Sequence, residues 1–220
     1  MTGHLEALLH MFAYLDAYDR SRLAFDPSYI DHDEVERPVW SDFYDVPELP
    51  DCDVLPPGAP EARGLPIQMT TFVDSDHAGD KRTRRSRTGV LIFLNMAPTL
   101  WMSRKQTSIE TSSFGSEFSA MKTGVELSEG LRYKLQMMGI PLDGPTHVKA
   151  DNMSVVSNTS VPESVLKKKS NSIAYHYVRE CAARSIVTVS WERSASNLAD
   201  MLTKIQSVLV RFRLARKFMK

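Results

Sequence analysis

Four acidic residues stand beside apolar segments instead of in the charged stretches where acids usually lie. Asp74 follows the β-favouring run TTFV, and Asp151 follows the alternating run THVKA. Glu117 and Asp200 each lie within a helical pattern, next to its apolar positions. Burial of one carboxylate is costly, and four converging carboxylates would repel one another. A bound cation would resolve both problems.

Magnesium is the cation that suits such a set, because it takes oxygen ligands from carboxylates, water and phosphates. Two Mg²⁺ ions about 4 Å apart form the known clamp for in-line displacement at a phosphodiester. One ion generates the attacking hydroxide and the other stabilises the leaving oxygen, so no Cys or His nucleophile is needed. We therefore expect a site for two Mg²⁺ ions, with Mn²⁺ as their substitute.

Each acid also has an ordinary structural interpretation when it is taken alone. Asp74 is suited to cap a turn, and Asp151 to an Asx-turn or a helix N-cap. Glu117 and Asp200 are equally consistent with solvated helix positions. The pattern of single residues leaves both interpretations open.

The elements that would position the acids can be read from periodicity. Residues 111–138 repeat apolar side chains at helical spacing, whereas residues 88–95 form a β-favouring apolar run. Strands are expected at 68–74, 88–95, 99–105, 146–151 and 186–191, and helices at 111–138, 152–158, 171–184 and from an N-cap at Ser196 onward. Short connections between the first three strands predict an antiparallel meander, and helix-linked strands then complete a mixed sheet.

The N-terminal part of the chain has a different character. Apolar residues at spacings of three and four predict an amphipathic helix over residues 4–18. Residues 26–66 are acidic and rich in proline, which predicts an extended linker. We expect boundaries near residues 66 and 206, with a basic C-terminal tail over 206–220.

The formal net charge of zero hides an asymmetry along the 220 residues. Residues 1–65 hold 14 acids and 4 Lys/Arg, a balance of −10, which leaves 13 acids and 23 Lys/Arg, +10, for the remainder. The basic part suggests a polyanionic partner, or else simple docking on the acidic part. The chain has no apolar run near 18 residues and no signal-peptide pattern, and its two cysteines form no disulfide framework. We expect no membrane span, no secretion and a reducing compartment.

Seven blocks of local sequence occur in a specific order. They are FVDSDHAGD (72–80), RRSRTG (84–89), WMSRKQ (101–106), TSSFGSEFSAM (111–121), ADNMSV (151–155), KKKSNSIAYHYVRE (167–180) and NLADMLTK (197–204). In these blocks the chain resembles the ribonuclease H domain of copia-type retrotransposon polyproteins. The stretch HLEALLHMFAYL (4–15) is similar to the segment that follows the reverse transcriptase palm in the same polyproteins.

The resemblance implies an α/β fold with a ribonuclease H-like five-stranded mixed sheet. Strands one to three would be antiparallel, helices would flank the sheet, and a helical and irregular extension would precede residues 67–205. The acidic set of that family would correspond to Asp74, Glu117, Asp151 and Asp200, as catalytic residues and metal ligands. The implied activity is two-metal-ion cleavage of the RNA strand of RNA–DNA hybrids. The implied setting is a cytoplasmic virus-like particle or the nucleus, next to a polymerase domain that the chain lacks.

Eight residues near the acids are candidates for substrate binding. Such hybrids are recognised through backbone geometry and 2′-OH groups. The basic candidates for phosphate contacts are Arg84, Arg85, Lys167 and Lys168, and the polar ones are Ser112, Ser113, Asn152 and Asn197. Helix and turn capping is an equally good explanation for each polar candidate. Asp76 is expected to be a turn residue or a supporting group.

Two other functions compete with the nuclease. One is a catalytically inactive, nucleic-acid-binding remnant of a retrotransposon polyprotein, which the loss of an acid would have favoured. The other is an unrelated enzyme such as a transposase or integrase, whose last acid lies about 35 residues after the second. Glu163 is only 12 residues past Asp151 and stands next to Pro162, which fits that spacing poorly.

Overall fold

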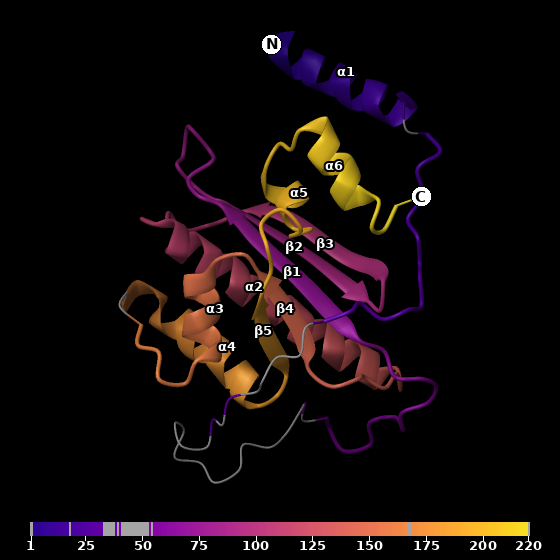
Figure 1. Ribbon diagram of the computed structural model, residues 1–220, viewed down its shortest axis with the longest axis vertical. Coiled ribbons are helices and arrows are strands. Elements are labelled where there is room, and N and C mark those ends of the chain that lie inside the picture. The colour runs from indigo at the N-terminus through magenta and orange to yellow at the C-terminus, as the bar shows by residue number, and fades with distance from the viewer. Residues whose placement is uncertain are drawn as a thin grey trace.

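The computed structural model describes residues 2–17, 19–32, 38, 40, 53, 55–166 and 169–219. At its centre is a five-stranded sheet with strand order β3-β2-β1-β4-β5 (Figure 1). The strands are β1 (Met69–Asp76), β2 (Arg87–Leu94), β3 (Ala97–Lys105), β4 (Thr146–Ala150) and β5 (Val187–Trp191). Strands β1–β2 and β2–β3 pair antiparallel, whereas β1–β4 and β4–β5 pair parallel. The predicted mixed sheet, antiparallel in its first three strands, is confirmed.

The central strands β1 and β2 are buried along most of their length because helices cover both faces of the sheet. Every residue of β1 except Asp76 is buried, and six residues of β2 are buried. The edge strand β3 instead alternates between more and less exposed positions over much of its length. The buried strand β1 therefore holds Asp74 at its carboxyl end, next to the core.

Helices form a layer on each face of the sheet (Figure 1). One layer contains α2 (Ser113–Met137), α3 (Met153–Ser160) and α4 (Ser172–Ala183), and the other contains α5 (Asp200–Thr203) and α6 (Val208–Ala215). The main core packs Phe118 and Met121 of α2 against Val73 and Val90 of the sheet. A second, smaller core lies under α5 and α6, with members Phe72, Leu91, Phe93, Leu198, Ala199, Leu214 and Phe218. This second core holds α5 against the sheet.

The prediction that the last helix begins at Ser196 is wrong. The Ser196 hydroxyl lies in a turn, where it contacts the Glu192 carboxylate and, at 3.0 Å, the Arg193 carbonyl oxygen. Asn197 ties the following chain to β1, because its Nδ2 donates to the Val73 carbonyl oxygen at 2.9 Å. Its Oδ1 accepts from Ala199 N at 3.1 Å, so α5 begins only after this anchor. The segment predicted as a basic tail then contains α6.

The N-terminal extension begins with α1 (Thr2–Ala17), close to the predicted range 4–18. Its described apolar side chains, including Leu5 and Phe12, are exposed. The chain then runs along the sheet domain, where Ala24 N donates to Phe218 O and Met96 N to Ser28 O, each at 2.8 Å. Residues 33–37, 39, 41–52 and 54 of the predicted linker lie outside the described part. Over the described ranges, the helices are too short or too polar to traverse a bilayer.

Candidate active site

Two neighbouring strands and one helix bring three carboxylates together. Val73 of β1 pairs with Ala150 of β4 in parallel register, so the next residues, Asp74 and Asp151, lie side by side at one edge of the sheet. Glu117 reaches the same point from α2. One oxygen of each of these three carboxylates lies within 4.8 Å of the others. We call these three residues the acid group.

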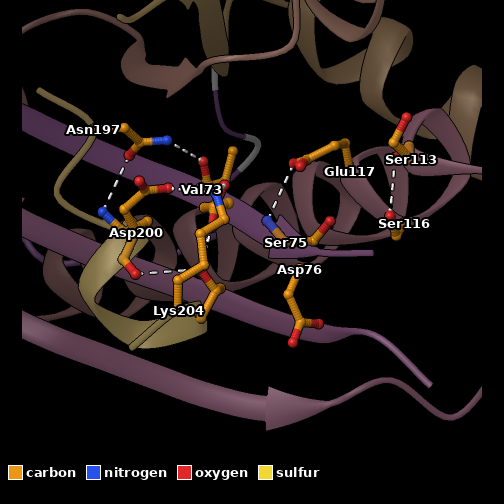
Figure 2. Close-up of polar contacts among 12 residues, drawn as sticks. Val73, Ser75, Asp76, Ser113, Ser116, Glu117, Asn197, Asp200 and Lys204 are labelled. Atoms are coloured by element: carbon orange, nitrogen blue, oxygen red, sulfur yellow. Dashed lines mark hydrogen bonds and ion pairs between the residues drawn. The ribbon is translucent and has the colours of Figure 1, made fainter. Parts of the chain in front are cut away.

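Glu117 owes its position to the start of α2 and to one backbone hydrogen bond. The helix begins at Ser112, whose hydroxyl caps it by accepting from Gly115 N at 3.2 Å. Phe118 is fully buried in the main core, which fixes the rotation of the helix. The Glu117 carboxylate accepts a hydrogen bond from Ser75 N at 3.1 Å (Figure 2). Because Ser75 follows Asp74 directly, this bond holds the Glu117 carboxylate next to the end of β1.

Burial and mutual repulsion disfavour the charged forms of two of these acids. The pKa of Asp74 is raised to about 7, first by burial and then by the charges of Asp200 and Asp151, although Thr203 and Lys204 oppose the rise. The pKa of Glu117 is raised to about 9 by burial and by repulsion from Asp74 and Asp151. A nearby positive charge would therefore stabilise the ionised group.

Asp200 lies beside the acid group but is not a member of it among the described residues. The link between them is Lys204, whose Nζ lies 2.7 Å from Asp200 Oδ1 (Figure 2). The same Nζ lies 3.2 Å from Asp74 Oδ1. Thr203 donates its hydroxyl proton to Asp74 Oδ2. Gln206 Nε2 donates to the other Asp200 oxygen at 3.3 Å. The four predicted acids thus gather in one region, with the fourth held through a lysine.

These residues fit a divalent cation. Asp74 is fully buried, and its carboxylate has only the Thr203 hydroxyl and the half-exposed Lys204 as side-chain partners in the described part. The acid group offers oxygen ligands alone, which favours a hard ion such as Mg²⁺ over zinc. The Asp151 carboxylate is available as a metal ligand, because Asn152 and not Asp151 is the N-cap of α3.

A cavity of about 550 Å³ adjoins the acid group through Thr203 and Lys204. We call it the basic cavity; it is lined by Asp76, Gly79, Asp80, Arg85, Ser86, Arg87, Lys105, Thr203, Lys204 and Ile205. It holds four basic side chains and two acidic ones, and Lys105 and Lys204 are already paired with carboxylates. Asp76 accepts from Arg87 N, and Asp80 pairs with Lys105, whose hydrogen bond lowers the pKa of that carboxyl. Arg85 and Arg87 form no ion pair within the described residues, and their positive charge suits a phosphate backbone.

The structure also locates the expected turn residue and the basic candidates. Asp76 is the last residue of β1 and not part of a turn, because its pairing with Arg87 extends the strand by two residues past Asp74. Arg84 and Arg85 are exposed in the loop between β1 and β2, and Arg85 lines the basic cavity. Lys167 and Lys168 lie outside the described residues. Phosphate binding by these four side chains stays a prediction.

The polar candidates are engaged in local structure. Asn152 accepts from Ser154 N at 3.1 Å and Val155 N at 3.3 Å. Asn197 is fully buried between Val73 and Ala199, as described above, and Ser112 caps α2. Ser113 is exposed at the start of α2. Their contact with substrate also stays a prediction, and Ser113 is the freest of the four to make it.

Three contributors to the site were missed from the sequence. Thr203 and Lys204 belong to the block NLADMLTK, and the spacing of four from Asp200 to Lys204 is a detectable helical pair signal. Ser75 acts through its backbone N–H, which no side-chain pattern reveals. Glu163 of the competing hypothesis lies exposed in a turn, and it is absent from the acid group within the described chain.

The sheet order, the strand directions and the position of the acids define a ribonuclease H-like α/β domain. Sequence relatives of the chain include Pol polyproteins of retrotransposons, which confirms the resemblance. The chain is 27% identical over 142 residues to the retrovirus-related Pol polyprotein from transposon RE1 of Arabidopsis thaliana, covering 64% of this chain and 10% of that protein. It is 29% identical over 135 residues to that from transposon TNT 1-94 of Nicotiana tabacum, covering 61% and 10%. The match thus spans about a tenth of the length of these relatives.

No protein-family model matches the chain. The N-terminal RNase H domain of rv2228c from Mycobacterium tuberculosis superposes with a TM-score of 0.48 and 14% identity, covering 69% of this chain and 96% of that one. LC11-RNase H1, in complex with an RNA/DNA hybrid, superposes with a TM-score of 0.47 and 16% identity, covering 62% and 94%.

Proposed function

We propose that this chain is a metal-dependent ribonuclease H that hydrolyses the RNA strand of RNA–DNA hybrids, as part of a retrotransposon Pol polyprotein. The observation that carries the proposal is the convergence of Asp74, Glu117 and Asp151, with one oxygen of each within 4.8 Å of the others. The relationship to Pol polyproteins supports the substrate class. The same proposal includes a polymerase domain as partner and a cytoplasmic or nuclear site of action.

The acid group, together with Asp200, would hold two Mg²⁺ ions. Bound there, the ions supply an activated water and stabilise the leaving oxygen. The protein's own groups orient the ligands: the Thr203 hydroxyl fixes one Asp74 oxygen, and Ser75 N–H fixes one Glu117 oxygen. The basic cavity binds backbone phosphates beside the reacting bond.

A second candidate function is nucleic-acid binding without catalysis, which the basic cavity alone would support. The preserved set of four acids favours the nuclease over this remnant. A cluster of buried carboxylates without a function would only destabilise the folded state, because each raised pKa reflects an unfavourable environment for the ionised group.

The test is cleavage of a hybrid that carries a label on either the RNA or the DNA strand. With Mg²⁺ or Mn²⁺, we expect cuts in the RNA strand only, and EDTA should abolish them. Single-stranded RNA and duplex RNA should be cut far more slowly. Tight hybrid binding without any cutting would support the inactive remnant, and cutting of duplex DNA would support the transposase or integrase class.

A further inference from the structure

Lys204 brings a positive charge into the acid site from the end of α5. Its Nζ contacts Asp200 Oδ1 at 2.7 Å and Asp74 Oδ1 at 3.2 Å, so one ammonium bridges two carboxylates from different elements. We propose that Lys204 is a tethered cation that joins Asp74 and Asp200 in the metal-free protein and competes with a divalent ion for them. This inference rests on the proposed function, and it makes Lys204 a positioning residue that sets the affinity for metal.

The surroundings of the two carboxylates explain why a cation is needed there. Asp74 is fully buried and the Asp200 side chain is 12% exposed, so water screens their repulsion poorly. The backbone of Lys204 is fixed, because its N–H donates to Asp200 O at 3.1 Å as the helix ends. The side chain, in contrast, is 41% exposed. It can therefore withdraw into solvent while the backbone that carries it stays in place.

Lys204 divides the site into two parts. It makes no hydrogen bond to Glu117 or Asp151 in the described structure, so these two carboxylates are open to one divalent ion while the lysine stays on Asp74 and Asp200. An ion shared by Asp74 and Asp200 must first displace the ammonium. The proposal therefore predicts two metal affinities, of which the weaker includes the displacement of Lys204.

The experiment measures Mn²⁺ binding by titration calorimetry and, separately, the unfolding temperature in EDTA. The variants are Lys204→Gln, which removes the charge, and Lys204→Arg, which keeps it. The matched control is Lys122→Gln, because Lys122 pairs with Glu126 at the same spacing of four on α2, and neither side chain belongs to the acid group. For Lys204→Gln we expect the weaker of the two Mn²⁺ binding steps to become about tenfold tighter, because a half-exposed ion pair no longer competes with the metal.

The same variant should unfold at a lower temperature in EDTA and recover the loss when Mn²⁺ is added. Lys204→Arg and Lys122→Gln should both keep the wild-type metal affinities. If wild type binds Mn²⁺ and Lys204→Gln binds it no more tightly, the role of Lys204 is wrong and the nuclease proposal stands. If neither protein binds Mn²⁺ at all, the metal site itself is wrong and both proposals fall.

Discussion

The hydroxyl of Thr203 donates a hydrogen bond to the buried carboxylate of Asp74, which joins α5 to β1 across 129 positions of sequence. This contact needs α5 to lie very close to the sheet, and Gly89 of β2 makes that possible. A Cβ atom at position 89 would lie 2.8 Å from both the Ala199 carbonyl oxygen and Thr203 Cγ2. The position of Asp200 therefore depends on the absence of a side chain at residue 89.

Gly89→Ala should impair catalysis more than it impairs folding. The added methyl group forces α5 outward, and a misplacement of about 1 Å at a reacting site costs about 100-fold in rate. The measurement is single-turnover cleavage of a labelled hybrid, together with the unfolding temperature. Gly130→Ala is the control, since a Cβ there meets nothing within 4 Å. A Gly89→Ala protein that cuts at the wild-type rate would show that the contact between α5 and β1 does not position the site.

Metal-free protein should lose stability as the pH rises. Asp74 and Glu117 have pKa values raised from 3.8 and 4.5 to about 7 and about 9. Their protonated forms are favoured in the folded state, so this stability is complete below about pH 4 and is lost as the pH rises through about 7 and then about 9. In EDTA, we expect the melting temperature to fall between pH 5 and pH 9 by more than about 2–4 °C, the equivalent of about 1 kcal/mol.

Saturating Mg²⁺ should flatten this dependence, because a bound cation stabilises the ionised carboxylates. Glu117→Gln should reduce the loss at the alkaline end. A melting temperature in EDTA that rises steadily over the same range would contradict the assigned direction of both pKa shifts.

Asp53 should stabilise the fold although it precedes the sheet domain in sequence. Its carboxylate lies 2.7 Å from Nη2 of Arg132, and both side chains are less than a tenth exposed. Asp53→Asn leaves a buried guanidinium without its charge partner, which should cost about 3 kcal/mol, or about 6–12 °C in melting temperature. Asp143→Asn, at an exposed position, should change the stability by less than about 0.5 kcal/mol. Equal melting temperatures for the two variants would show that the extension is not part of the folded unit.

The basic cavity should contribute a salt-dependent share of hybrid affinity. Replacement of Arg85 and Arg87 by Gln removes two phosphate contacts, so the slope of log affinity against log salt should become shallower by about 2. The measurement is hybrid binding in Ca²⁺ or EDTA at several salt concentrations. Lys122→Gln, which removes a half-buried lysine that does not line the cavity, should leave the slope unchanged. An unchanged slope in the double variant would show that the basic cavity does not contact the phosphates of the hybrid.

The sheet and most of the acid site were predictable because their sequence signals are local. Strand β2 contains the apolar run VLIFL, β1 is rich in β-favouring residues, and the helical apolar pattern that includes Phe118 places Glu117 on α2. The parallel register of β1 and β4, which brings Asp74 and Asp151 together, pairs Val73 with Ala150 from distant parts of the chain, and no local pattern predicts it.

The region around Asp200 was predictable only in part. The start of α5 depends on Asn197, which contacts Val73 O across 124 positions, and no local pattern reports such a contact. The role of Lys204 depends in the same way on Asp74, which reaches it from another element. The hydrogen bonds of Asp53 with α2 likewise join two segments that are distant in sequence, so no periodic pattern in either segment predicts them.

The central claim is tested most directly by single-turnover cleavage of a strand-labelled hybrid in Mg²⁺ by Asp74→Asn, Glu117→Gln and Asp151→Asn. Each substitution removes a ligand from the acid group, so we expect each to slow RNA cleavage by about 1000-fold or more, while Asp143→Asn cuts at the wild-type rate. Hybrid binding should persist in all four proteins. RNA cleavage that survives in any of the three acid variants at more than about a tenth of the wild-type rate would contradict a metal site built on these carboxylates.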